Sequence, residues 1–206
     1  MPDLSILIPS LFPPLVERLI KSIDVDAEVV VCSPERVERA VWVEDTVKAG
    51  CDPAIRQAFR KSTGDSVIVM ADDHVFVPGA LAKAIALWDQ DELMDLNAGW
   101  VPRIFGSLSV AYPLCHRATV ENLYSHFFPY TQHFGDHSFA LAARAAGYQI
   151  LQCPHVCVSY PWEDRLGCPE SPTKTSSASY DFGKFRIYDD FPEYSKGWEG
   201  REDFNS

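Results

Sequence analysis

Residues 66–79, with the sequence SVIVMADDHVFVPG, decide the fold that we expect for this chain. The segment 66–71 is an almost continuous apolar run of strand length, without the alternation of a half-solvated strand. It therefore predicts a strand buried on both faces, as in a parallel sheet. The run ends abruptly in Asp72, Asp73 and His74. Ligands of open α/β sheets bind at the carboxyl ends of the strands, so we expect these three side chains in a binding site.

The spacing within this triplet indicates a metal. Asp72 and His74 are two residues apart, so on an extended backbone they point the same way. A carboxylate and an imidazole facing each other suit Mn²⁺ or Mg²⁺, and a diphosphate could supply the remaining oxygen ligands. The alternative interpretation is an acidic turn after a strand, where Asp is common.

The residues before this stretch alternate between strand and helix signals. Residues 5–10 and 28–34 are short apolar runs with a proline near the end, and a helix opens between them at Pro13. Residues 40–43 form a weaker third strand. A second helix is expected at 53–62, with Asp52 as its N-cap. This order is typical of βαβ units in a doubly wound, mainly parallel sheet.

The residues after the stretch are less regular but continue the pattern. Helices are expected at 80–88 and 117–125, and a third begins near Asp136 and ends at a left-handed Gly147. Further strands are expected at 98–102, 106–111, 148–152 and 156–160. We therefore expect one Rossmann-like α/β domain over residues 1–163, followed by an irregular tail or lid over 164–206.

Composition narrows the class of protein. The 206 residues are 47% hydrophobic and carry a net charge of −11, which argues against a broad nucleic-acid interface. No apolar run approaches the length of a membrane span and no signal peptide is evident, so a soluble cytoplasmic protein is expected. The six cysteines lack paired CxxC spacing and are expected to be reduced. Cys153 and Cys157 flank His155, which leaves a soft-metal site open as an alternative.

Three motifs occur in an order that resembles a known family. They are SILIP at 5–9, GDSVIVMADDH at 64–74 followed by PGAL at 78–81, and GDH at 135–137 ahead of AAGYQI at 145–150. Over residues 4–160 they resemble the nucleotide-sugar glycosyltransferases of the GT-A fold, and most of all the family 2-like group. The resemblance implies a metal-dependent transfer of a sugar from a nucleoside-diphosphate sugar to an acceptor hydroxyl.

The resemblance also implies roles for individual residues. Asp72, Asp73 and His74 match the metal motif, usually Asp-x-Asp, and Asp73 is expected to meet ribose or metal-bound water. His155 matches a further metal-binding histidine. Asp136 matches the catalytic base of inverting members. Residues expected to line the nucleotide pocket or approach the diphosphate are Pro9, Ser10, Ser33, Gly50 and Arg56.

Two departures from the family pattern leave alternatives open. The Asp that usually ends the second strand and holds the base or ribose is replaced by Ser33, so the identity of the nucleobase is not implied. His137 follows Asp136 and is a rival base, because histidine titrates near neutral pH. Structural interpretations also stand: Asp136 as a favourable acid at a helix N-terminus, His155 as a hydrogen-bonded strand-end histidine, and Arg56 as part of a solvated face.

Two other functions remain open from the sequence. A nucleotidyltransferase uses a related sheet and metal, but it normally carries a Gly-rich, basic loop after the first strand, where this chain has SLFPP at 10–14. A catalytically inactive nucleotide-sugar-binding module is the second alternative. The donor sugar, the acceptor (a glycan, a small molecule or a modified polymer) and the oligomeric state are not implied.

Overall fold

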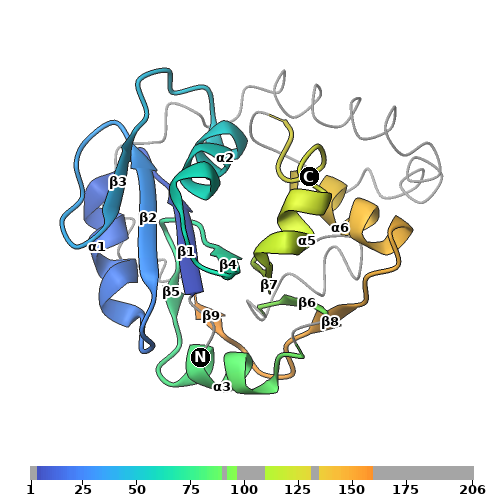
Figure 1. Cartoon of the computed structure of the whole chain (residues 1–206). Coiled ribbons are helices and arrows are strands. Elements are labelled where there is room, and N and C mark those ends of the chain that lie inside the picture. Colours follow the sequence, from blue (N-terminus) through green and yellow to red (C-terminus); the bar gives the residue numbers. More distant parts are fainter. Residues whose placement is uncertain (1–3, 90–91, 97–109, 131–134, 160–206) are drawn as a thin grey trace, which may run out of the picture.

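Seven strands form the central sheet in the order β3-β2-β1-β4-β7-β6-β8 (Figure 1). The structure is a computed structural model, and it describes residues 4–89, 92–96, 110–130 and 135–159. The strands of the sheet are β1 (Leu4–Pro9), β2 (Glu28–Ser33), β3 (Val41–Glu44), β4 (Ser66–Val69), β6 (Leu93–Asp95), β7 (Pro113–His116) and β8 (Ile150–Gln152).

The sheet is mainly parallel. β1 pairs in parallel with β2 and β4, and β2 pairs in parallel with β3. The exception is β7, which lies antiparallel between β4 and β6, whereas β6 and β8 are again parallel. The carboxyl ends of β1, β4 and β6 consequently meet at one edge of the sheet, where the Asp-Asp-His triplet follows β4.

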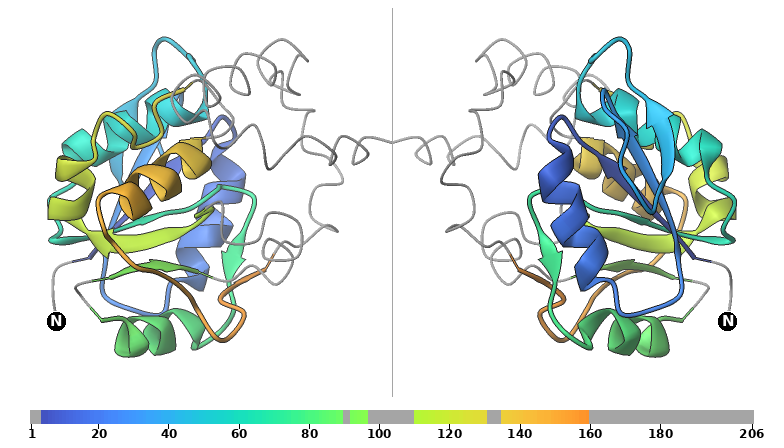
Figure 2. Two further views of the ribbon diagram at one scale, coloured as in Figure 1. Left: turned by 90° about the vertical axis from the view of Figure 1, so that its right-hand side faces the viewer. Right: turned by 90° about the vertical axis from the view of Figure 1, so that its left-hand side faces the viewer.

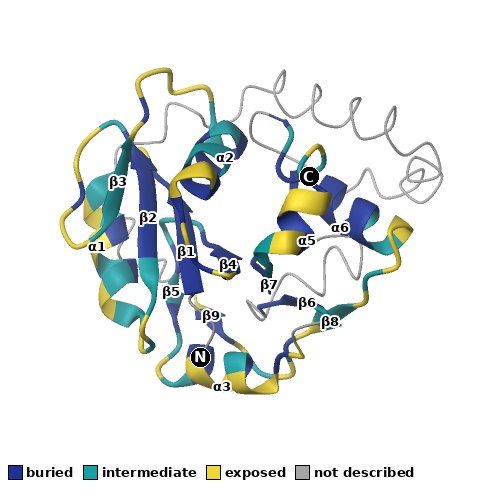
Figure 3. Cartoon of the chain, viewed as in Figure 1, coloured by how far each residue is buried: buried dark blue, intermediate teal, exposed yellow. Residues whose placement is uncertain are grey.

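Helices cover both faces of the sheet (Figures 1 and 2). They are α1 (Pro13–Ser22), α2 (Cys51–Lys61), α3 (Ala80–Leu87), α5 (Arg117–Asn122) and α6 (Gly135–Ala145). Successive side chains of a strand point to opposite faces of the sheet. Ile6 and Ile8 of β1 pack in one apolar cluster with residues of α1 and α3. Leu7, between them, packs in a second cluster with residues of α2, α5 and α6. The continuous apolar strands are thus buried on both sides (Figure 3).

A small second sheet lies beside the triplet. β5 (Val75–Phe76) begins directly after His74 and pairs antiparallel with β9 (Val158–Ser159). The amide of Val77 also donates to the carbonyl of Cys157 at 2.8 Å. The end of the described chain is therefore tied to the segment that follows β4.

The expected α/β class and its mainly parallel, helix-flanked sheet are confirmed. The strand expected at 156–160 belongs to the second sheet, and β6 and β7 were not expected. The strand expected at 98–102, most of that at 106–111 and the tail at 164–206 lie outside the described residues. Within the described ranges, the helices are all too short or too polar to span a membrane.

One helix start was predicted wrongly. We expected Asp52 as the N-cap of a helix beginning at Pro53, but α2 begins at Cys51 and Gly50 is its N-cap, with φ of 117°. That left-handed conformation is open to glycine at little cost. Asp52 consequently lies inside the first turn, where it is 2% exposed and available for a different role.

Candidate functional site

The triplet after β4 is linked to the end of β1 by a short hydrogen bond. Ser10 Oγ donates to Asp72 Oδ2 at 2.6 Å, and the same hydroxyl accepts the amide of Phe12 at 2.9 Å. The hydroxyl therefore sits between the backbone that leads into α1 and the Asp72 carboxylate. This bond fixes one orientation of that carboxylate at the carboxyl edge of the sheet.

His74 is held by two neighbours. Its Nδ1 lies 2.6 Å from Asp73 Oδ1, and its Nε2 lies 3.0 Å from the hydroxyl of Tyr112. Its side chain is 7% exposed. Asp73 is anchored in turn, because Arg18 Nη2 donates to its backbone carbonyl at 3.3 Å. Since both ring nitrogens have a protein partner, His74 would have to exchange one of them to bind a metal directly.

Helices α2 and α6 meet at a buried carboxyl group. Asp52 Oδ2 accepts the amide of Tyr130 at 3.2 Å. A Cβ at Gly135, the first residue of α6, would lie 2.2 Å from this oxygen and 3.0 Å from the Cα of Phe128. Only glycine fits this close approach. Burial, followed by the charge of Asp136, raises the pKa of Asp52 to about 8.

Asp136 occupies the first turn of α6, as expected, with His137 beside it. Asp136 Oδ1 lies 3.0 Å from Nδ1 of His137. Burial acts to raise the pKa of Asp136, but the charge and hydrogen bonds of His137 act in the opposite direction. The net effect is a pKa below the ordinary value of 3.8, so Asp136 is ionised at neutral pH and able to accept a proton.

The charges of these acids act on two common neighbours, Cys51 and Tyr112. Burial raises the pKa of the Cys51 thiol well above its usual value, and so do the charges of Asp52, Asp72, Asp136 and Asp73. Burial also raises the pKa of Tyr112, helped by Asp73, Asp95 and Asp136. We call the carboxyl groups of Asp52, Asp72, Asp73, Asp95 and Asp136 the acidic cluster.

The acidic cluster has the donor chemistry of a site for a hard divalent cation. Carboxylate oxygens are the ligands that Mn²⁺ and Mg²⁺ prefer. Burial raises the pKa of Asp95 to about 7, and the nearby Asp136 adds to this effect. A cation bound among these carboxyl groups would offset their mutual repulsion. Their oxygens suit such an ion by chemical type, but among the described residues no three of them bring oxygens within 4.8 Å of one another, so binding of the ion stays a prediction.

Other predicted site residues lie at the same edge of the sheet. Pro9 ends β1, Ser33 ends β2 and Gly50 caps α2. Ser33 is fully buried, and its hydroxyl donates to the carbonyl of Glu35 at 2.6 Å. Arg56 stacks on Tyr124, with its guanidinium carbon 4.5 Å from the ring centroid. That contact favours a packing role, and its contact with a diphosphate stays a prediction.

The described contacts of His155 are with a cysteine sulfur and a backbone carbonyl. Its Nδ1 lies 3.6 Å from Cys153 Sγ, and its Nε2 lies 3.0 Å from the carbonyl oxygen of Ala80. Its binding to the same cation as Asp72 and His74 remains a prediction.

The sequence did not indicate the roles of two acids at this edge. Asp95 ends β6 and accepts the amide of Tyr112 at 3.1 Å, and Asp52 was taken only as a helix cap. The positions of Asp95 and Tyr112 depend on strands β6 and β7, whose short segments carry little local signal. The available sequence signal was the position of Asp95, an acid directly after the short apolar segment of β6.

The acidic cluster makes stability dependent on pH. Asp52 has a pKa of about 8 in the folded protein against 3.8 as its ordinary value. Its contribution to stability is therefore fully present below about pH 4 and is lost as the pH rises through 8. We expect Asp52→Asn to flatten the fall in thermal midpoint between about pH 5 and pH 8. Exposed Asp65→Asn is the control, and an equal slope in wild type and Asp52→Asn would contradict the assignment.

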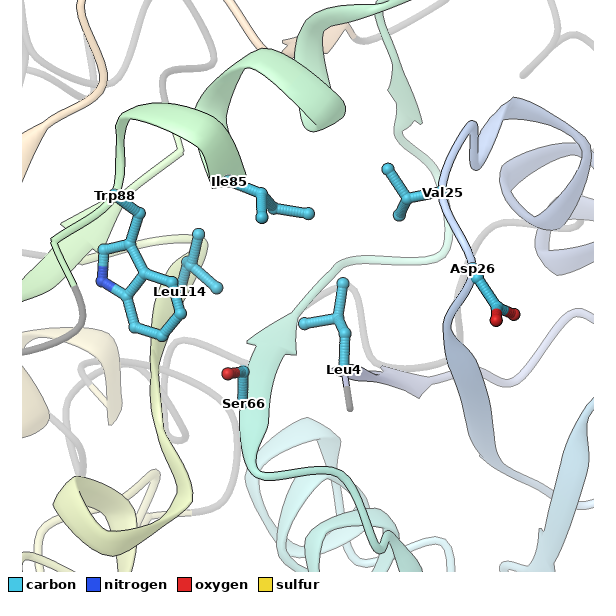
Figure 4. Close-up of a pocket in the computed structure, with 7 residues that line it drawn as sticks. All are labelled: Leu4, Val25, Asp26, Ser66, Ile85, Trp88 and Leu114. Carbon is cyan, nitrogen blue, oxygen red and sulfur yellow. The ribbon is translucent and has the colours of Figure 1, made fainter. Parts of the chain in front are cut away.

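A pocket at the opposite edge is different in character. It is lined mainly by apolar side chains from the starts of β1 and β4, the α1–β2 connection, α3 and β7 (Figure 4). Its lining residues are Leu4, Val25, Asp26, Ser66, Ile85, Trp88 and Leu114. This edge holds the amino ends of the parallel strands, so the pocket is separate from the acidic cluster.

Comparison with solved structures identifies the fold. A mannosyltransferase from Pyrobaculum calidifontis, solved with GDP-Man and Mn²⁺, aligns with a TM-score of 0.60 and 18% identity over 76% of this chain and 58% of that one. The S. aureus protein TarS, solved as residues 1–349 with UDP, aligns with a TM-score of 0.58 and 14% identity over 76% of this chain and 60% of that fragment. This chain has the GT-A fold.

A third structure with the GT-A fold extends the comparison. Glucosyl-3-phosphoglycerate synthase from Mycobacterium tuberculosis, solved with Mn²⁺, UDP and phosphoglyceric acid, aligns with a TM-score of 0.53 and 16% identity over 73% of this chain and 68% of that one. The chain spans 58% of the length of the mannosyltransferase and 36% of the longer TarS chain. No protein-family model matches the sequence, and no curated protein sequence matches it.

Proposed function

We propose that this chain transfers a sugar from a nucleoside-diphosphate sugar to an acceptor hydroxyl, with Mn²⁺ or Mg²⁺ bound at the acidic cluster. The observation that carries the proposal is the position of that cluster, at the carboxyl edge of a sheet with the GT-A fold. Of the three compared proteins of this fold, one is a mannosyltransferase solved with GDP-Man and Mn²⁺, one is a glucosyl-3-phosphoglycerate synthase solved with UDP and Mn²⁺, and TarS was solved with UDP.

The donor side of the proposed reaction rests on Asp72. Its carboxylate, oriented by Ser10, would hold the cation, with Asp73 nearby and His74 as a further predicted ligand. His155, predicted from the sequence as another ligand of this cation, contacts Cys153 and Ala80 instead. When bound, the cation supplies a Lewis acid that neutralises charge on the leaving diphosphate. Pro9, Ser10, Ser33 and Gly50 border the same edge and would line the nucleotide pocket.

The acceptor side of the proposed reaction rests on Asp136. It lies at the N-terminal turn of α6, where the preceding Gly135 closely approaches Asp52 of α2. Its lowered pKa keeps it ionised, so it would accept the proton of the acceptor hydroxyl during in-line attack at the anomeric carbon. This assignment describes an inverting transferase, in which His137 orients the base.

Calorimetry with a panel of nucleotide sugars tests the proposal. Full-length protein is titrated with GDP-Man, UDP-GlcNAc and UDP, each with and without Mn²⁺ or Mg²⁺. We expect cation-dependent binding of at least one ligand and slow release of free sugar from a bound donor. Pyrophosphate release from a nucleoside triphosphate would indicate a nucleotidyltransferase, and binding without any turnover would indicate an inactive module.

A further inference from the structure

A second group of metal-binding side chains lies in the loop between β8 and β9. Ligand atoms of Cys153, His155 and Cys157 all lie within 4.8 Å of one another. The two sulfurs are 3.3 Å apart, and Cys153 Sγ lies 3.6 Å from His155 Nδ1. Both cysteines are in the thiol form and fully buried, whereas His155 is partly exposed and offers a route of entry.

We propose that Cys153, His155 and Cys157 bind one thiophilic divalent cation, Zn²⁺ in the first instance, as a structural site with its own ligand set. Two sulfurs at about 2.3 Å from a tetrahedral zinc lie about 3.8 Å apart, and a sulfur and a nitrogen about 3.6 Å apart. The observed spacings need a change of only about 0.5 Å in the sulfur pair. Water would complete the fourth position.

The hydrogen bond of His155 prepares its ring for this role. Nε2–H donates to the carbonyl oxygen of Ala80 at 3.0 Å, which leaves Nδ1 unprotonated. Cys153 Sγ lies 3.6 Å from Nδ1 and 3.8 Å from Nε2, so the ring would turn slightly to direct the Nδ1 lone pair at a shared ion. Metal-binding histidines generally donate their other ring N–H to a carbonyl or carboxylate in this way. The bond therefore selects the tautomer that a metal needs.

The backbone of the loop is fixed at both ends. The amide of Cys153 donates to the carbonyl of Asp95 at 3.0 Å, and the carbonyl of Cys157 accepts the amide of Val77 at 2.8 Å. A cation bound between these residues would fasten the β8–β9 loop to the start of α3. It would thereby support β5, which begins directly after His74.

Charge balance also favours this occupant. Binding releases one proton from each thiol, so two thiolates and a neutral imidazole around Zn²⁺ carry no net charge. The surroundings suit a neutral group, because Cys153 and Cys157 share an apolar cluster with Phe76, Leu81 and others. Mn²⁺ and Mg²⁺, in contrast, prefer oxygen ligands and would select the acidic cluster.

Metal binding by full-length protein tests this proposal. Reduced, metal-free protein is titrated with Zn²⁺ against a chromophoric indicator, and with Co²⁺ to record the thiolate-to-cobalt charge-transfer band. We expect one ion per chain in the wild type and in Cys115→Ala, which removes a buried thiol elsewhere. His155→Gln should weaken binding at least roughly tenfold, and Cys157→Ala should abolish the charge-transfer band.

Three results would overturn the proposal. The first is wild-type affinity for Zn²⁺ no greater than that of His155→Gln. The second is a Cys153–Cys157 disulfide, detected by peptide mapping in protein kept under argon. The third is a His155→Gln variant that keeps zinc but loses Mn²⁺-dependent nucleotide binding, because the imidazole would then belong to the acidic cluster. Asp72→Ala should leave zinc binding unchanged, which separates this site from the proposed transferase function.

Discussion

Asp136→Asn should slow glycosyl transfer at least about a hundredfold while the affinity for the nucleotide sugar stays normal, since loss of a general base typically costs 10²–10⁴-fold in rate. The amide keeps the shape and much of the hydrogen bonding of Asp136, but it cannot accept the hydroxyl proton. Donor binding should survive because Asp72 and its neighbours handle it. The measurements are kcat from product formation and the donor Kd from calorimetry.

Variants of the neighbouring histidine separate the alternatives. His137 contacts Asp136 at 3.0 Å, so His137→Ala should slow transfer less than Asp136→Asn does. If His137→Ala instead gives the large loss and Asp136→Asn stays active, the histidine is the base. If neither change slows transfer, the reaction is retaining or the acceptor approaches from elsewhere, and the assignment of Asp136 is wrong.

Asp72→Ala should abolish cation-dependent nucleotide binding and leave the fold intact. The side chain is held by Ser10 at the carboxyl end of β4, outside the two apolar clusters, so its loss removes a ligand rather than core packing. Calorimetry with nucleoside diphosphate and Mn²⁺ measures the effect, and circular dichroism checks the fold.

Two further variants calibrate that result. Ser10→Ala should weaken binding less than Asp72→Ala, because it removes the residue that orients the carboxylate but not the carboxylate itself. Asp65→Asn, an exposed acid just before β4, should bind as the wild type does. Unchanged affinity in Asp72→Ala would remove Asp72 from the proposed donor site.

Local sequence determined the framework of this protein. The apolar runs of β1, β2 and β4 could be predicted because strands buried on both faces need continuous hydrophobic residues. The helices α1 and α6 carry their own signals, in Pro13 and in the left-handed Gly147, whose φ is 88°. The position of Asp72 at the carboxyl end of β4 could also be predicted, because the apolar run that forms the strand ends directly before this residue.

The tertiary structure decided how the ends of those elements meet. The antiparallel insertion of β7 between β4 and β6 sets Tyr112 against His74, at 3.0 Å, and buries Asp95. The contact of Gly135 with Asp52 joins residues more than eighty positions apart, and Ala80 meets His155 across a similar separation. Strand pairing and burial depend on partners distant in the chain, so no local pattern specifies them. The pKa values of the buried carboxyl groups follow from that packing, because desolvation exists only once the chain has folded.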